Sequence, residues 1–351
     1  MINTSIKFLK LLPPEIAHSI TLKALKFIKF KLDTTEDQIL HQHLFGLDFS
    51  NPIGLAAGFD KNAEVVKSMF SMGFGFVEVG TVTPKPQKGN QKPRVFRLEK
   101  DNAIINSLGF NNKGLIKVKK NISKIKNNFA RNKIIGVNLG KNKNTLNAVD
   151  DYFLGIEQLG DLSSYITINI SSPNTDGLRD LQLRGNFENL IKQIVKKREE
   201  IDSINKKPIL IKISPDLNED QLRDIALISL ANNIDGLILT NTSTQRPKNL
   251  KTKNLPHKGG ISGKPLFENS NKILKKMYNL TNGQITLIGV GGISNGSDCF
   301  EKIKSGASLV QLYTALTYSG PLLVSKIKNE LIYLIKTDGY KNISEVVGKS
   351  V

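Results

Sequence analysis

Eight short apolar segments, each followed by a helical pattern, constrain the fold of this chain more than any other feature. Each segment is rich in β-branched residues and ends in Gly, Asn, Thr or Ser. The segments span residues 53–58, 75–80, 134–140, 165–171, 208–214, 236–241, 286–292 and 308–314. Nearly continuous apolar strands that alternate with helices are typical of a parallel sheet covered by helices. Eight such units predict a closed (β/α)₈ barrel in the α/β class, with an open, doubly wound sheet as the alternative.

The polar residues of these segments fall at or just past the carboxyl ends of the predicted strands. They are Lys61, Thr81, Asn138, Asn169, Lys212, Asn241 and the pair Gly291–Gly292. In a barrel those ends converge on one rim, where barrel enzymes carry out their chemistry. Long insertions follow the second, fourth and sixth strands, at roughly residues 81–133, 171–190 and 243–268. Insertions of this length are expected to form lids or substrate walls over the rim.

The first 40 residues differ from this pattern and are predicted to form a separate amphipathic helical segment. A Pro-Pro-Glu run at residues 13–15 favours a helix start. Apolar residues then share one face at i, i+4 spacing, namely Ile16, Ile20, Ala24, Phe27 and Ile28. A short amphipathic piece at residues 6–12 precedes them. The pattern fits a helix pair packed on the end of a barrel as well as a membrane contact, so we divide the chain into residues 1–40 and a barrel domain at 41–351.

The composition excludes several other architectures. With Cys299 as its one cysteine, the chain has no intrachain disulfide and no cysteine metal cluster. No apolar run approaches the ~18 residues that cross a bilayer. Lys7 and Lys10 interrupt the apolar N-terminus, and no arginine precedes Arg94, which is unlike a signal or transit peptide. The net charge of +19 suits nucleic acid or an anionic membrane. However, the basic stretch at residues 113–133 is spaced like a solvated helix face.

Glycine motifs on the last two strands indicate a phosphate site. GVGGIS at residues 289–294 and QLYTAL at 311–316 stand where barrels usually bind phosphate. Glycines let backbone N–H groups approach an anion, and a following helix N-terminus adds a favourable dipole. Either motif alone would be read as a tight turn. GGISGK at residues 259–264 is expected to close the same pocket.

Two interior lysines and several asparagines suggest the chemistry of the ligand. Lys212 is placed to stabilise negative charge on a reduced flavin ring, and Lys61 suits a carboxylate, although either lysine fits an internal salt bridge. Amides suit a planar ligand with alternating C=O and N–H groups. Such amides recur at Asn106, Asn138, Asn169, Asn174 and Asn241. No metal site is predicted, because these clusters lack histidine and paired carboxylates.

Two further side chains need an interpretation. Ser172 lies in NISSPNT (residues 169–175) without a histidine partner, which is unlike a hydrolase nucleophile. It could accept a proton if Thr175 and water served as a relay. The four histidines are scattered, and His18 on the N-terminal helix is interpreted as a surface residue.

In chain order, ten motifs closely resemble the quinone-dependent class of dihydroorotate dehydrogenases. They are AAGFDK, GTVTPKPQKGNQKPRVFRL, NSLGFNN, GVNLGKNK, INISSPNTDGLR, IKISPDL, NTS, GGISGKPL, IGVGGI and GASLVQLYT. The resemblance runs from the N-terminal helices to about Gly320, and the tail TDGYKNISEVVG also looks familial. Two departures are mild: Phe59 stands where the family often has leucine, and Thr314 where some members have serine. Thr314 keeps the backbone N–H that phosphate binding needs.

The resemblance implies one non-covalent FMN per chain and oxidation of (S)-dihydroorotate to orotate in pyrimidine biosynthesis. Ser172 would remove the C5 proton, the C6 hydride would pass to flavin N5, and a quinone entering between the N-terminal helices would reoxidise the flavin. Implied FMN contacts are Ala57, Gly58, Phe59, Asp60, Lys61, Thr81, Asn138, Asn169, Lys212, Thr240, Gly263, Gly292, Tyr313 and Thr314. Implied substrate contacts are Lys61, Asn106, Ser107, Leu108, Gly109, Phe110, Asn169, Asn174, Asn241 and Thr242. The implied location is the cytoplasmic face of a bacterial inner membrane, bound peripherally through the N-terminal helices, with no nucleic-acid partner.

Three alternatives compete with this reading. A soluble dihydroorotate dehydrogenase that uses fumarate or a nicotinamide would carry cysteine at Ser172 and would lack the N-terminal helices. An FMN-dependent tRNA-dihydrouridine synthase would explain the basic charge. That chemistry needs a cysteine acid on an active-site loop, whereas Cys299 lies in the helical segment after the seventh strand. A non-catalytic, RNA-binding barrel would not need the flavin-type cradle.

Overall fold

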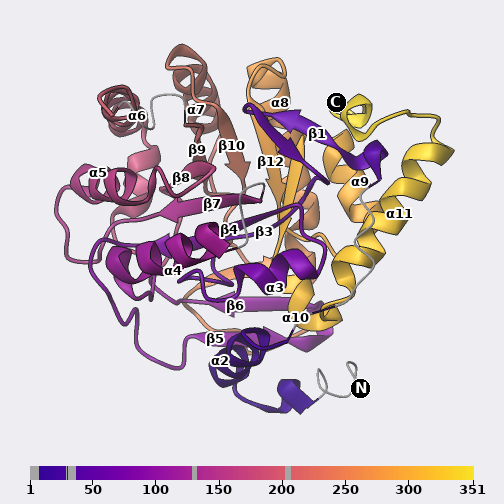
Figure 1. The fold of residues 1–351 in the computed structure, drawn as a ribbon, viewed down its shortest axis with the longest axis horizontal. Helices are drawn as coiled ribbons and strands as arrows, with labels where there is room; N and C mark the ends of the chain where they lie inside the picture. The colour runs from indigo at the N-terminus through magenta and orange to yellow at the C-terminus, as the bar shows by residue number, and fades with distance from the viewer. Residues whose placement is uncertain (1–7, 29, 31–36, 129–132, 202–206) are drawn as a thin grey trace.

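A closed barrel of eight parallel strands forms the centre of the molecule. The computed structural model describes the chain except for residues 1–7, 29, 31–36, 129–132 and 202–206 (Figure 1). Around the barrel the strand order is β10-β12-β13-β3-β4-β7-β8-β9. The strands are β3 (Ile53–Leu55), β4 (Phe76–Val82), β7 (Ile134–Leu139), β8 (Tyr165–Asn169), β9 (Ile209–Ile213), β10 (Gly236–Leu239), β12 (Thr286–Val290) and β13 (Leu309–Leu312). Each falls on one of the eight predicted segments, so the barrel is confirmed and the open sheet is wrong.

Helices surround the barrel and bury the outer face of its strands (Figure 1). They are α3 (Val66–Ser71), α4 (Gly114–Asn128), α5 (Ala148–Leu159), α6 (Arg184–Glu199), α7 (Glu219–Ala231), α8 (Phe267–Thr281), α9 (Gly296–Lys304), α10 (Thr314–Ser319) and α11 (Leu323–Thr337). Local sequence sets their starts: Asn218 and Gln221 form a capping box on α7, and the Asn295 side chain caps α9. Because both faces of the strands are covered, their residues are almost all apolar and buried.

A hairpin of β1 (Gln42–Leu44) and β2 (Leu47–Phe49) closes the amino end of the barrel. Phe49 packs edge-on against Phe76, the first residue of β4, with ring centroids 5.4 Å apart. Phe45, in the turn between β1 and β2, packs beside Gly236, the first residue of β10. An apolar cluster joins Phe49 and Phe76 to one residue from each of β7, β8, β9, β10, β12 and β13. Among the described residues the amino end is therefore filled, whereas the carboxyl end carries the large cavity.

A second, three-stranded sheet covers part of the carboxyl end. Its strands are β5 (Val95–Leu98), β6 (Ala103–Asn106) and β11 (Gly260–Gly263), in the antiparallel order β11-β6-β5. The register pairs Asn106 with Gly260. The insertions after β4 and β10, which were expected to act as lids or substrate walls, thus combine into one sheet over the rim. The insertion after β8 contains a short 3₁₀ helix, η3 (Leu178–Gln182). Other 3₁₀ turns are η1 (Gln38–Leu40), η2 (Glu99–Asp101), η5 (Lys264–Leu266) and η6 (Ile343–Val346).

The N-terminal segment packs on this small sheet, beside β5 (Figure 1). The predicted helix is present as α2 (Pro14–Leu25), and residues 8–11 are also helical. Leu25 is buried in the main core, while the predicted apolar face of Ile16, Ile20, Phe27 and Ile28 is exposed. Within the described part of the chain no helix has the length and apolarity to span a bilayer.

Candidate active site

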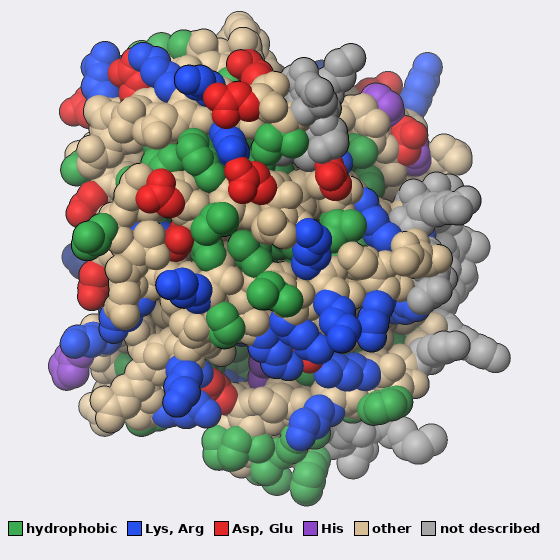
Figure 2. Space-filling view, turned by 60° about the vertical axis from the view of Figure 1, so that its left-hand side comes forward, with side chains coloured by type: hydrophobic (Ala, Val, Ile, Leu, Met, Phe, Trp, Pro, Cys, Tyr) green, Lys and Arg blue, Asp and Glu red, His purple; other side chains and the backbone are tan. Residues whose placement is uncertain are grey.

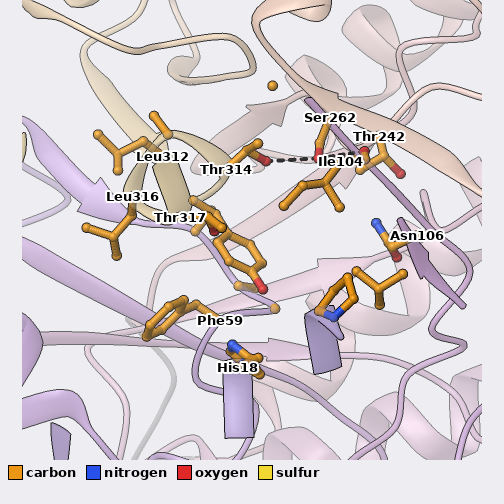
Figure 3. A pocket seen from close by; sticks show the side chains of 18 of the residues that line it. His18, Phe59, Ile104, Asn106, Thr242, Ser262, Leu312, Thr314, Leu316 and Thr317 are labelled. Atoms are coloured by element: carbon orange, nitrogen blue, oxygen red, sulfur yellow. Dashed lines mark hydrogen bonds between the residues drawn. The ribbon is translucent and has the colours of Figure 1, made fainter. Parts of the chain in front are cut away.

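A cavity of about 1170 Å³ opens at the carboxyl end of the barrel and runs beneath α2 (Figure 3). Its walls come from the strand ends, the β6–β11 strands, α10 and α2. Every site residue predicted from the sequence lines this cavity except Asp60, Ser107 and Asn138. Residues from the ends of seven of the eight strands and from three insertions therefore meet in one place, and β7 contributes only Asn138 behind the wall.

The three exceptions lie just behind the wall. The Asp60 carboxylate accepts hydrogen bonds from the Glu64 and Val65 amides, both at 2.8 Å, and burial raises its pKa. It therefore organises the turn after β3. The backbone N–H of Ser107 donates a hydrogen bond to the Arg94 carbonyl at 2.8 Å. Asn138 is buried one side chain further in.

Asn138 belongs to a buried network that orients the predicted ring-binding amides. Its Nδ2 donates to Glu78 Oε1 at 2.8 Å, which leaves Oδ1 as an acceptor. Thr81 Oγ1 donates to that oxygen at 2.6 Å, and Asn169 Nδ2 donates to it at 3.0 Å. Because each partner is satisfied in one orientation, the Asn169 amide is held in place before any ligand arrives.

The same network continues to the opposite side of the rim. Ser171 Oγ donates to Asn169 Oδ1 at 2.7 Å and accepts from Asn241 Nδ2 at 2.8 Å. Arg179 supports this loop from outside, since its Nε donates to the Ser171 carbonyl at 3.1 Å. Its terminal nitrogen pairs with Asp216 at 2.8 Å. The Asn241 amide is therefore positioned by β8 as well as by β10.

Lys212 supplies positive charge to the cavity wall. The side chain is 5% exposed. Burial lowers the pKa of the lysine, and the negative charge of Glu78 opposes that shift. Glu78 also accepts hydrogen bonds from Tyr165, Thr167 and Gln311 at 2.8–3.1 Å. The wall thus combines a buried cation with a fully hydrogen-bonded carboxylate deeper in the barrel.

Lys61 is the second cation of the cavity. Its Nζ donates to the Gly58 carbonyl at 2.7 Å. Burial lowers the pKa of Lys61 to about 8, while the Glu15 carboxylate opposes the shift. Two partly desolvated lysines in one cavity favour anionic ligands over neutral ones.

Ser172 is buried in the cavity wall, and its Oγ accepts a hydrogen bond from the Asn174 amide at 3.2 Å. Asn174 Nδ2 in turn donates to the Asn106 carbonyl at 3.2 Å, which ties this loop to β6. In the described structure no hydrogen bond joins Ser172 directly to Thr175, so a relay between them would need water. The hydroxyl proton of Ser172 remains available to the cavity.

The predicted phosphate cradle is built from three segments. Gly263, Gly291 and Gly292 have φ values of 98°, 119° and 80°, in the region that favours glycine. A Cβ on Gly292 would lie 2.5 Å from the Cβ of Phe267, so only glycine fits there. Thr314 Oγ1 donates to Ser262 Oγ at 2.9 Å and joins α10 to β11 across the cradle (Figure 3). Backbone that a ligand can approach this closely suits an anion.

The interpretation of His18 as a surface residue is wrong. Its ring lies in the cavity, edge-on to Phe59 with centroids 5.2 Å apart, and near Tyr313 at 6.4 Å (Figure 3). Burial, and then the charge of Lys61, lower the pKa of His18 to about 3. A second stripe on α2 contains the signal that was missed, because His18, Thr21 and Leu25 recur at i, i+3, i+7 and all line the cavity.

Two arginines that sequence reasoning did not single out anchor the N-terminal segment. Arg94 is buried and pairs with Glu15 on α2 at 2.9 Å, while its other terminal nitrogen donates to the carbonyls of Lys88 and Asn90. Arg97 donates to the carbonyls of Lys10 at 2.6 Å and Leu12 at 2.8 Å. The roof of the cavity is thus attached to the β5 insertion by buried ionic and backbone contacts.

Comparisons with known proteins agree with this geometry. The family described as "Dihydroorotate dehydrogenase" matches residues 39–335. Dihydroorotate dehydrogenase (quinone) of Parvibaculum lavamentivorans is 47% identical over 347 residues, covering 98% of this chain and 97% of that protein. The mitochondrial enzyme of Mus musculus is 43% identical, covering 97% and 87%. Ligand-free type DHODH from Eimeria tenella superimposes with a TM-score of 0.91 at 41% identity, covering 96% and 99%.

Proposed function

The chain belongs to the dihydroorotate dehydrogenase family, and from that premise we propose that it is an oxidoreductase that converts dihydroorotate to orotate and passes the electrons to a quinone. This is a step of pyrimidine biosynthesis. Relatives that are 43–47% identical over nearly the whole chain carry the name dihydroorotate dehydrogenase (quinone). The observation that carries the proposal is the cavity at the carboxyl end of the barrel, which joins a rim of cations and amides to the helix α2.

The residues of the cavity fit a flavin, and we assign FMN to it. Gln311 lines the cavity and its buried Oε1 has no hydrogen-bond partner, as expected for a polar ligand contact. Lys212 and the Asn169 amide would hold the ring, and the glycines at 263 and 292 would hold the phosphate. When bound there, FMN would supply the acceptor for the substrate hydride and the donor of electrons to the quinone.

The chain's own residues define the roles at the substrate. The amides of Asn106, Asn174 and Asn241 present donors and acceptors that match the alternating C=O and N–H groups of a dihydropyrimidine ring. Lys61 would bind the carboxylate. Ser172 Oγ would accept the proton from C5 while its own hydroxyl proton leaves through water toward Thr175, because it is the buried hydroxyl between these amides and has its acceptor geometry set by the backbone N–H of Asn174.

We propose that the quinone enters along α2 from a membrane surface. Exposed apolar side chains, including Phe8, Leu11, Ile16 and Phe27, cover the outer face of the N-terminal segment. Figure 2 shows hydrophobic side chains gathered at the lower end of the molecule, at the level of α2 in Figure 1, with Lys and Arg side chains above them. Such a surface suits the interface of an anionic bilayer.

These observations support a peripheral membrane protein, which we assign to the cytoplasmic face of a bacterial inner membrane, with residues 1–40 as its contact segment. Lys10, Lys23 and Lys26 would contribute charge to that contact, whereas Lys7, Lys29 and Lys31 lie outside the described residues. The cavity beneath α2 would then receive an apolar quinone without passage through water.

The competing enzymes differ at two residues. The soluble class would place a cysteine at Ser172. A tRNA-dihydrouridine synthase would need an accessible cysteine acid, but Cys299 is buried in α9 and burial raises its pKa. The structure therefore favours the quinone-dependent reading over both.

Anaerobic mixing tests the function. Dihydroorotate should bleach the flavin absorbance of the purified protein, and a quinone should then restore it. Denaturation should release FMN. Release of FAD, or a flavin that dihydroorotate leaves oxidised, would overturn the proposal, and faster reoxidation by fumarate or NAD than by quinone would favour the soluble class.

A further inference from the structure

Lys302 is a buried lysine that lies outside the cavity. It belongs to α9, on the outer layer of the barrel, and is 0% exposed. Its stem packs on β12, where a Cβ built on Gly289 would lie 2.6 Å from Lys302 Cγ. A glycine on the strand thus makes room for this one side chain. Burying an ammonium group is costly unless it has strong partners, so its position needs an explanation.

The partners of the ammonium group all lie within the first five residues of α8. Lys302 Nζ donates to Ser270 Oγ at 2.8 Å and to Asn271 Oδ1 at 2.6 Å. It also lies 5.2 Å from the ring centroid of Phe267.

These partners are neutral, and within the described residues no carboxylate forms an ion pair with Lys302. Burial lowers the pKa of Lys302 to about 7, and Cys299 and Asp298 of the same helix oppose this shift. Asp298 is itself engaged by the amide and hydroxyl of Ser294 at 2.8 and 2.6 Å. Below about pH 7, where Lys302 is mostly protonated, its positive charge therefore has no direct counter-ion among the described residues.

Ser270 connects this charge to the phosphate cradle. Its Oγ lies 3.1 Å from the carbonyls of both Gly291 and Phe267, and its one proton can be donated to Gly291 while the oxygen accepts from Lys302. In a trans peptide the carbonyl and the next N–H point in opposite directions. Holding the Gly291 carbonyl toward α8 therefore directs the Gly292 N–H away from α8. Gly292 lines the cavity, so this N–H is placed for an anion.

We propose that Lys302 is a positioning residue for the phosphate end of the flavin: through Ser270 it orients the Gly291–Gly292 peptide, and its uncompensated charge selects an anionic phosphate over a neutral alcohol. The inference rests on the proposed function, because it needs FMN in this cavity. Lys302 would therefore raise the affinity for FMN relative to riboflavin, which has the same ring and lacks the phosphate.

Titration of the full-length apoprotein with FMN and with riboflavin tests the proposal, with quenching of flavin fluorescence as the readout. Lys302→Met keeps the apolar stem and removes the charge. FMN affinity should fall roughly tenfold or more, the size of a lost charge-assisted contact. Riboflavin affinity should change by less than about twofold on the same scale. Lys304→Met is the matched control, since Lys304 lies on the same helix but pairs with Asp338 at the surface, and it should leave both affinities unchanged.

Ser270→Ala provides a second, independent variant, because it keeps the charge and removes the link to Gly291. It should also lower FMN affinity while sparing riboflavin, and it decides the matter if Lys302→Met fails to fold. An equal loss of both affinities would show a merely structural role, and an unchanged FMN affinity would show no role. Either result would overturn the inference about Lys302 and leave the proposed function unaffected. Failure of the wild-type apoprotein to bind FMN would overturn the proposed function and the inference with it.

Discussion

Substitution of Ser172 tests whether this side chain accepts the substrate proton. Its Oγ is the buried hydroxyl that faces the cavity between the amides of β6 and β10. Ser172→Ala should slow flavin reduction by dihydroorotate by roughly 10²–10⁴-fold, the usual worth of a positioned base. Reoxidation by quinone should be unchanged, because no C–H bond breaks in that step. Stopped-flow absorbance resolves the two half-reactions, and Ser172→Cys, which keeps a proton acceptor, should retain more activity than Ser172→Ala. Reduction of the alanine variant at the wild-type rate would exclude Ser172 as the base.

His18 gives a prediction for pH. Burial and Lys61 lower its pKa from 6.5 to about 3. A histidine whose folded pKa lies below its unfolded value contributes stability above about 6.5, and this contribution is lost as the pH falls from about 6.5 toward about 3. His18→Phe, which keeps an aromatic ring against Phe59, should therefore lose less thermal stability than the wild type between pH 7 and pH 4.5. The comparison is the drop in Tm for each protein, and equal drops would contradict the assignment.

Helix α2 has two faces with different surroundings. One face lines the cavity with His18 and Leu25 and is held by the ion pair between Glu15 and Arg94. The other is apolar and exposed, and three of its residues, Ile20, Ala24 and Ile28, also line the cavity. Deleting residues 1–40 would disturb both faces at once, since Leu25 is part of the main core. Single substitutions on the exposed face therefore separate membrane contact from packing more cleanly than truncation does.

Phe27→Gln tests the exposed face. Phe27 is 87% exposed beside α2, and Ile116 on α4 has the same exposure but lies on a different element. Phe27→Gln should weaken vesicle binding and turnover with a long-chain quinone, because an apolar anchor is lost from the bilayer interface. Dihydroorotate-driven reduction of a small soluble dye should be unaffected. Ile116→Gln should change neither vesicle binding nor turnover with the quinone. Equal effects of the two substitutions would leave no special role for this face.

The local sequence pattern predicts the barrel strands but not the contacts between segments that lie far apart in the chain. The eight strands could be read from local runs, because each strand is buried on both faces and its apolar character is continuous. The β5–β6–β11 sheet could not, since the pairing of Asn106 with Gly260 joins insertions far apart in the chain. His18 was misread for the same reason: its environment depends on where α2 docks, which helical periodicity does not contain. The separation of Asp60 and Asn138 from the cavity also depends on side-chain packing behind the strand ends.

The charge of the whole molecule leads to a last prediction. The chain carries a formal net charge of +19, and several exposed lysines lie on α4 as well as near α2. A charge spread over the molecule attracts an anionic surface at long range, and salt weakens this attraction because the Debye length falls from roughly 10 Å at 0.1 M to about 3 Å at 1 M. Binding to vesicles of anionic lipid, measured by co-sedimentation, should therefore fall steeply as salt is raised. Binding to neutral vesicles should be weaker and nearly independent of salt, since it depends on the apolar face alone. Turnover with a vesicle-embedded quinone should follow binding, while anaerobic flavin reduction by dihydroorotate should not. Equal binding to neutral and anionic vesicles would mean that the positive charge plays no part in membrane contact.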